Sequence, residues 1–307
     1  MRIMDLHCDT IYYLTENDAC LLETDGQYDL KRANEAGIGV QFFALFTMPL
    51  DQISTLRKIM KQMDVYFCEV GKNQEYIVPI FCKEDLSKAE SEGKLGGVLH
   101  LEGAECIGKD IEILRLFYRL GLRSMGLTWN HRNLLADGVG EGPLAGGLSQ
   151  KGYEVVKEME RLGMILDLAH IAPKGFYNAL DAYSLPVMVT HANIKALCNH
   201  RRNLDDHQLK TLADHGGVVG ISQVSDFVSN TSADIDAFMD HIVYACDLIG
   251  VKHVALGSDF DGTDHVVLPH IGAYKKLPDY LKDRGFTSDE INMILYKNGL
   301  EVIKAVL

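Results

Sequence analysis

The sequence predicts an α/β protein that folds as a single (β/α)8 barrel of the TIM type. Eight short apolar runs, rich in Val, Ile and Leu and without clean alternation, have the character of parallel strands that are buried on both faces. Amphipathic helical patterns alternate with these runs, which is the repeat of such a barrel. No G-x-G-x-x-G or Walker-type loop follows the first run, and this disfavours the competing open, doubly wound sheet.

The expected strands are short and interleaved with helices. Two connections, 128–148 and 259–285, are long, and long loops in a compact domain are usually functional or mobile. No linker, low-complexity tract or internal repeat interrupts the pattern, so we expect one domain over residues 1–307. Its active site should lie at the C-terminal ends of the strands. The eight strands are expected at residues 3–6, 40–47, 97–101, 123–127, 164–168, 186–190, 217–222 and 253–257.

Several helices have recognisable ends. Asp205 and Gln208 are spaced as a capping box, in which each side chain bonds the backbone N–H of the other residue. Thr287 and Glu290 repeat this spacing and are expected to open the C-terminal helix. Apolar residues spaced by threes and fours predict a further helix over 235–249, ended by a glycine.

Composition excludes several classes of function. The formal net charge of -13 argues against non-specific binding to nucleic acid, which needs clustered Lys and Arg. No run reaches the roughly 18 apolar residues of a membrane span, and the N-terminus lacks the plan of a signal peptide. The 7 cysteines are scattered without a C-x-x-C pair, unlike a disulfide framework or a zinc ribbon. We therefore expect a cytoplasmic protein without a nucleic-acid or membrane partner.

Polar side chains gather where the expected strands end. One strand-end histidine alone is usually no ligand, and aspartates before glycine usually form turns. Three histidines and three acids at the same end of five parallel strands are hard to explain as independent accidents. Together they favour a metal site, since they offer the oxygen and imidazole ligands that Zn²⁺ or a similar divalent ion takes. The set comprises His7 and Asp9 after the first strand, Glu102 after the third, His170 and His191 after the fifth and sixth, and Asp259 after the eighth.

The number of these candidates indicates two ions. A catalytic zinc takes about three protein ligands and keeps one position open. Five or six candidates are too many for one ion, but they fit two ions that share a carboxylate and hold a bridging hydroxide. His7 and Asp9 lie two residues apart, so in a strand both would face the same point and hold one of the ions.

At this point the sequence resembles the membrane (renal) dipeptidase family, the zinc dipeptidases of the amidohydrolase superfamily. The resemblance runs from residue 5 to about residue 300. It is carried, in the family's order and spacing, by "DLHCDT", "HLEGAE", "GLTWNH", "GGLSQKGYEVVKEMERLGMILDLAHIAP", "PVMVTHAN", "HRRNLDDHQLK" and "HVALGSDFDG". The resemblance implies a zinc-dependent dipeptidase, tolerance of a D-residue on the C-terminal side of the substrate, and a homodimer.

The resemblance also implies how the metals are held. One zinc would bind His7, Asp9 and Glu102, and the other would bind Glu102, His170 and His191. Glu102 would then bridge the two ions, as a carboxylate with two oxygens can.

Further residues take implied roles in catalysis and substrate binding. Asp259 would pass a proton from the attacking water to the leaving amine. Arg202 would bind the substrate's free carboxylate, with Arg201 as the alternative one position away. The animal enzymes carry a histidine directly after Leu-Thr, where this chain has Trp129, so Trp129 and His131 are both candidates for binding the substrate. If the loop is extended, the side chains of residues 129 and 131 point to the same side, so His131 substitutes for the family's histidine in holding the substrate's carbonyl oxygen. The alternative is that His131 is a purely structural histidine.

Two other functions stay open at this point. One is a binuclear-metal amidohydrolase that acts on another amide, an N-acyl amino acid or a lactone. The other is a metal-containing binding protein without catalysis, which the complete set of six strand-end residues disfavours. Around the site, Tyr12 and Tyr13 are expected to wall the substrate cavity, and His100 is expected either to orient a ligand or to be a buried structural residue.

Overall fold

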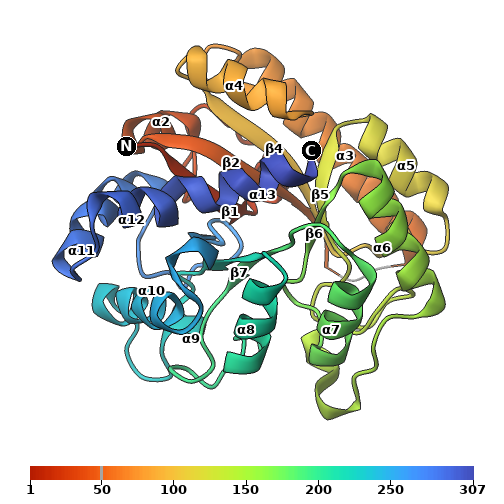
Figure 1. The fold of residues 1–307 in the computed structure, drawn as a ribbon. Helices are drawn as coiled ribbons and strands as arrows, with labels where there is room; N and C mark the ends of the chain where they lie inside the picture. The colour runs from red at the N-terminus through yellow and green to blue at the C-terminus, as the bar shows by residue number, and fades with distance from the viewer. Residues whose placement is uncertain (49–50) are drawn as a thin grey trace.

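The computed structural model describes residues 1–48 and 51–307, and its parallel strands form the predicted nearly closed barrel with helices around it (Figure 1). Successive strands are neighbours, in the order β1-β2-β4-β5-β6-β7-β8-β9. Both faces of these strands are buried, which explains why their sequences lack alternation. Their bounds are β1 Ile3–Cys8, β2 Ile38–Phe46, β4 Leu95–Glu102, β5 Leu122–Gly126, β6 Ile165–Asp167, β7 Met188–Ala192, β8 Val218–Ile221 and β9 Val254–Leu256.

Helices connect the strands and cover the outside of the barrel. Three 3-10 segments lie between them at Val139–Leu144, Val251–His253 and Ile271–Lys276, and a π-helical turn at Met293–Lys297 joins the last two helices. The helices are α1 Thr10–Asn17, α2 Leu30–Ala36, α3 Gln52–Lys72, α4 Lys83–Ser91, α5 Ile111–Arg119, α6 Gln150–Leu162, α7 Pro173–Ala182, α8 Asp206–Asp214, α9 Ser225–Val228, α10 Ile235–Ile249, α11 Leu277–Asp283, α12 Ser288–Asn292 and α13 Asn298–Val306.

The predicted helix ends are confirmed. Asp205 and Gln208 form a reciprocal capping box at the start of α8, and Thr287 and Glu290 form another at the start of α12. The helix expected at 235–249 is α10. In the described part of the chain, no helix has both the length and the apolar character that crossing a membrane requires.

A short strand, β3 (Ile77–Pro79), was not predicted. It pairs with the first half of β4, at Leu95–Gly97, while β5 pairs with β4 only from Leu99 onward. Three residues ending in proline carry too little pattern to be recognised as a strand. β3 therefore pairs with the part of the β4 edge that β5 does not reach.

The barrel closes through backbone bonds beside the strand ends that carry the candidate ligands. Asp9 N donates to Phe260 O at 2.8 Å, and Asp259 N donates to His7 O at 3.1 Å. The same seam holds Ser258, whose N–H donates to the buried Asp5 carboxylate at 2.7 Å. Closure therefore places the ends of β1 and β9 side by side.

The opposite end of the barrel is filled by apolar side chains. Helix α13 crosses the barrel in the view of Figure 1, and its Ile303 and Val306 belong to one buried cluster with strand residues such as Val40, Ile165 and Met188. This end is therefore packed core, which leaves the C-terminal ends of the strands for chemistry.

Candidate active site

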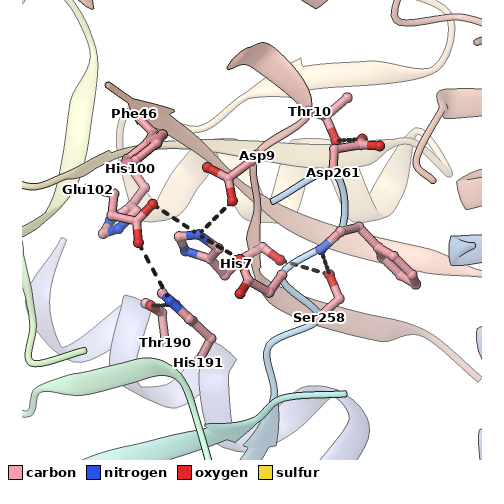
Figure 2. Close-up of polar contacts among 12 residues, drawn as sticks. His7, Asp9, Thr10, Phe46, His100, Glu102, Thr190, His191, Ser258 and Asp261 are labelled. Atoms are coloured by element: carbon pink, nitrogen blue, oxygen red, sulfur yellow. Dashed lines mark hydrogen bonds and ion pairs between the residues drawn. The ribbon is translucent and has the colours of Figure 1, made fainter. Parts of the chain in front are cut away.

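His7 lies among carboxylates at the end of β1. Its Nε2 is 3.4 Å from Asp9 Oδ2, 3.5 Å from Glu102 Oε2 and 3.7 Å from Asp259 Oδ1. Figure 2 shows contacts from the His7 ring to Asp9 and to Glu102, and the second oxygen of Glu102 points toward His191, whose ring centroid is 3.9 Å from that of His7. Asp9 has already left the strand, since it precedes the first turn of α1, yet the pair converges as the H-x-D spacing predicts.

The second oxygen of Glu102 faces two histidines. Oε1 is 2.7 Å from His170 Nε2 and 3.6 Å from His191 Nε2, and these two nitrogens are 2.9 Å apart. The ligand atoms of His7, Asp9 and Glu102, and those of Glu102, His170 and His191, each lie within 4.8 Å of one another. One carboxylate thus belongs to both of these groups, and a third group, His7, His191 and Asp259, shares one histidine with each of them.

The hydrogen bonds of the two histidines test whether these groups fit cations. His170 Nδ1 meets the side-chain oxygen of Asn130 at 3.0 Å, which can only accept, so we assign the proton to Nδ1. His191 Nδ1 meets Thr190 Oγ1, whose own proton goes to Asp167 at 2.7 Å. Both Nε2 atoms then present lone pairs to each other and to Glu102. Acceptors that converge in this way need a cation between them, so the residues fit a metal.

Electrostatics favours the same conclusion. Burial opposes a charge on His7, but Glu102 and then Asp9 outweigh it and raise the pKa of His7 well above its usual value. Burial lowers the pKa of His170 to about 4, and burial together with the nearby His7 lowers the pKa of His191 well below its usual value. His170 and His191 are therefore neutral, as metal-binding imidazoles are, and the carboxylates attract positive charge.

Thr190 supports His191 from behind. Its backbone N–H and its hydroxyl both donate to the Asp167 carboxylate, at 2.9 and 2.7 Å, and the hydroxyl oxygen is 3.0 Å from His191 Nδ1. His100, also buried, lies 3.4 Å from Asp167 Oδ2 and bonds Ser124. Partners of this kind fix the tautomer and orientation of a ligand histidine.

Replacing Thr190 by valine should weaken metal binding about 10–100-fold, because the isosteric side chain keeps the packing and removes the acceptor for His191 Nδ1. A chelator competition titration measures the change. Thr190→Ser, which keeps the hydroxyl, serves as the matched control and should bind metal as the unmodified chain does. Equal affinity in the valine variant would rule out this role.

Asp259 is held in an unusual backbone conformation. Its φ is +65°, as is that of His170, a region that L-residues enter rarely and that is concentrated at functional sites. Burial raises the pKa of Asp259 to about 8. Two residues on, Asp261 anchors the loop by accepting hydrogen bonds from Thr10 Oγ1 at 2.7 Å and from Gln27 N at 2.6 Å.

Gly262 fits tightly between two of the acids. A Cβ at this position would lie 2.3 Å from Asp9 Oδ2 and 2.6 Å from Asp259 Oδ1. Only glycine therefore lets this loop approach the carboxylates so closely.

A cavity of about 510 Å³ opens above these residues. Arg202 lines it, with a buried guanidinium that lies over the Phe227 ring at 5.3 Å and donates to His191 O at 3.0 Å. Burial lowers the pKa of Arg202 to about 10, which leaves it charged at neutral pH. Other lining residues include Asp9, Tyr12, Phe46, Glu102, Trp129, Asn130, His170, Arg201 and Asp259.

His131 does not lie where the sequence suggested. Trp129 and Asn130 line the cavity, but His131 is exposed and stands outside the described lining residues, with its ring 5.5 Å from Trp129. The chain bends from Trp129 through His131, so the extended loop on which the same facing depended is absent there. Tyr12 lines the cavity as expected, while Tyr13 lines a separate surface groove.

Sequence reasoning missed the supporting residues. Asn130 stands in the quoted "GLTWNH" and Asp167 and Thr190 stand in the strands that carry His170 and His191, yet nothing in those patterns marks them as partners. Their role becomes visible only when the strands lie side by side.

Comparison with known proteins agrees with this geometry. Residues 1–307 match the membrane dipeptidase family, peptidase family M19. The dipeptidase aclJ of Aspergillus oryzae is 33% identical over 296 residues, covering 92% of this chain and 70% of that protein. An uncharacterised dipeptidase of Schizosaccharomyces pombe is 33% identical over 287 residues, covering 85% and 69%.

Solved structures are also similar. A metallopeptidase from Rhodobacter sphaeroides, liganded with a phosphinate mimic of the dipeptide L-Ala-D-Ala, has a TM-score of 0.94 at 25% identity over 100% of this chain and 99% of that one. A metallopeptidase described as dipeptidase AC, of family M19, has a TM-score of 0.91 at 27% identity over 100% and 98%. The resemblance noted in the sequence is thereby confirmed, and this chain belongs to the membrane dipeptidase family M19, as a metallo-dipeptidase.

Proposed function

We propose that this protein hydrolyses the peptide bond of dipeptides with two zinc ions that share Glu102. The observation that carries the proposal is the placement of the two Glu102 oxygens. Oε2 faces His7 at 3.5 Å, whereas Oε1 faces His170 at 2.7 Å and His191 at 3.6 Å. His7, Asp9 and Glu102 would hold one ion, and Glu102, His170 and His191 would hold the other. Nitrogen and carboxylate donors without thiolate suit catalytic zinc.

The chain's own residues would handle the proton and the substrate. The ions supply a Lewis acid for the carbonyl and lower the pKa of water. Asp259 stands beside His7 and Asp9 at the base of the cavity, where its carboxylate can take a proton from the attacking water and return it to the leaving amine.

Arg202 would fix the substrate's C-terminal carboxylate. One of its N–H groups donates to His191 O, while its buried Nε has no partner among the described residues. A planar guanidinium with free donors at a cavity wall is suited to a carboxylate. The L-Ala-D-Ala mimic bound by the Rhodobacter enzyme supports a dipeptide with a C-terminal D-residue as substrate here too.

The test combines metal content with hydrolysis. Emission spectroscopy on protein purified without chelator should find two zinc ions per chain, and L-Ala-D-Ala and L-Ala-L-Ala should release free amino acids. Asp259→Asn should lower kcat by at least about 10²-fold while both ions stay bound, because proton transfer is lost. Asp264→Asn, an exposed acid in the same loop, is the control and should be unaffected.

Other results would contradict the proposal in distinct ways. Cleavage of N-acetyl amino acids without cleavage of dipeptides would replace the substrate class and keep the metals. A chain that holds one ion, or none, would refute the shared role of Glu102.

A further inference from the structure

One side of the cavity is built from aromatic rings. Tyr12, Phe46 and Trp129, here called the aromatic wall, all line the cavity and are half-buried. The rings of Tyr12 and Phe46 meet edge to face with centroids 5.7 Å apart, and those of Phe46 and Trp129 are 5.3 Å apart. Such contacts hold the three rings as one apolar surface.

The aromatic wall lies directly beside the proposed bridging carboxylate. Phe46 ends β2 and is the register partner of Glu102 in β4, and Figure 2 shows its ring next to Glu102. Tyr12 follows β1, and Trp129 follows β5, whose Gly126 pairs with Glu102 on the other side. The wall therefore spans the half of the barrel from β1 to β5.

Arg202 lies on the other half. It follows β7, donates to His191 at the end of that strand, and packs over Phe227 from α9, which follows β8. A dipeptide whose carboxylate binds Arg202, and whose peptide bond lies over Glu102, must extend its amino-terminal residue toward β1, β2 and β5. That direction leads to the aromatic wall.

We propose that the aromatic wall binds the amino-terminal side chain of the dipeptide and selects large apolar or aromatic residues there. This inference rests on the proposed function, because Arg202 sets the direction of the substrate. On the opposite side the lining is mixed: Val224 and Phe227 are apolar, but Phe227 is flanked by the Arg202 guanidinium and the His200 ring. The remaining lining residues there, Arg201 and Asp226, are charged. The two sides of the cavity therefore bind different residues of the substrate, and the preference for apolar side chains applies to the amino-terminal residue.

The test is a panel of dipeptides that differ at one residue at a time. With D-Ala held at the carboxyl end, kcat/KM for L-Phe and L-Leu at the amino end should exceed that for Gly and L-Asp by at least about ten-fold, since burying such a side chain is favourable. Reversed dipeptides, with L-Ala first and D-Phe or Gly second, should differ by less. Phe46→Ala should reduce the Phe-to-Gly ratio of kcat/KM by about ten-fold, mainly through KM.

Controls separate this inference from the proposed function. Tyr153→Ala removes a partly exposed aromatic residue of α6 outside the cavity and should leave the ratio unchanged. Trp129→Ala provides a second variant if Phe46→Ala fails to fold. Dipeptide hydrolysis with no amino-terminal preference, or with the preference at the carboxyl end, would overturn the inference while the proposed function stands. No hydrolysis of any dipeptide would overturn both.

Discussion

Replacing Glu102 by glutamine should remove both metal ions and lower kcat/KM by more than about 10⁴-fold, the effect of losing the centre that activates water and carbonyl together. Without the shared carboxylate, His7 and Asp9 remain on one side, and His170 and His191 on the other. Two protein ligands are fewer than the three that a catalytic zinc takes. Because glutamine has nearly the same shape, the fold should survive.

Metal analysis after dialysis, with circular dichroism to verify folding, measures this result. Glu105→Gln is the matched control, since it makes the same change three residues later at an acid that bonds Asn133, outside both ligand groups. It should keep two ions. If Glu102→Gln lost one ion and kept the other, Glu102 would be a ligand of a single site.

Replacing Gly262 by alanine should reduce kcat/KM by about 10³-fold or more, although this residue has no functional group. Its Cβ would lie 2.3 Å from Asp9 Oδ2 and 2.6 Å from Asp259 Oδ1, so one or both carboxylates must move. Displacement of a reacting group by about 1 Å can cost about 10²-fold in rate, and here the proposed metal ligand Asp9 and the proposed proton carrier Asp259 are displaced together. The ion held by His7, Asp9 and Glu102 should also be lost more readily.

Steady-state kinetics and metal content together measure the effect. Gly71→Ala is the control, because a Cβ there meets nothing within 4 Å and the residue lies in α3. That change should leave activity unaltered and raise stability by up to about 1 kcal/mol. A Gly262→Ala enzyme with two ions and near-normal activity would show that the loop shifts without disturbing the acids.

Much of the fold could be predicted because its determinants are local. Buried strands rich in branched residues can be recognised from their composition. Capping boxes such as that of Asp205 and Gln208 can be predicted from the spacing of the two residues alone. β3 escaped prediction because a strand of three residues is defined by its partner, β4, and not by its own sequence.

Some residues of the candidate site could likewise be predicted from local sequence, and others could not. Histidines and acids that follow strands can be found in the sequence, since a barrel gathers strand ends. His131 could not be placed, because the chain bends at residues 129–131, where Gly140 N donates to Asn130 O within the same long loop, and no local sequence pattern predicts that contact. The tight fit of Gly262 against Asp9 likewise joins segments that are distant in the chain.

The seam that closes the barrel also determines when Asp259 can join the rest of the candidate site during folding. The bond from Ser258 N to Asp5 Oδ1 spans 253 residues, and Asp259 reaches His7 only after β9 has docked on β1. Contacts between residues so far apart in the sequence form late in folding, because the entropy cost of closing the long intervening loop comes before the free energy that the contacts contribute. An ion held among the candidate ligands would therefore gain Asp259 as a neighbour only at the last step, the joining of the first strand to the last.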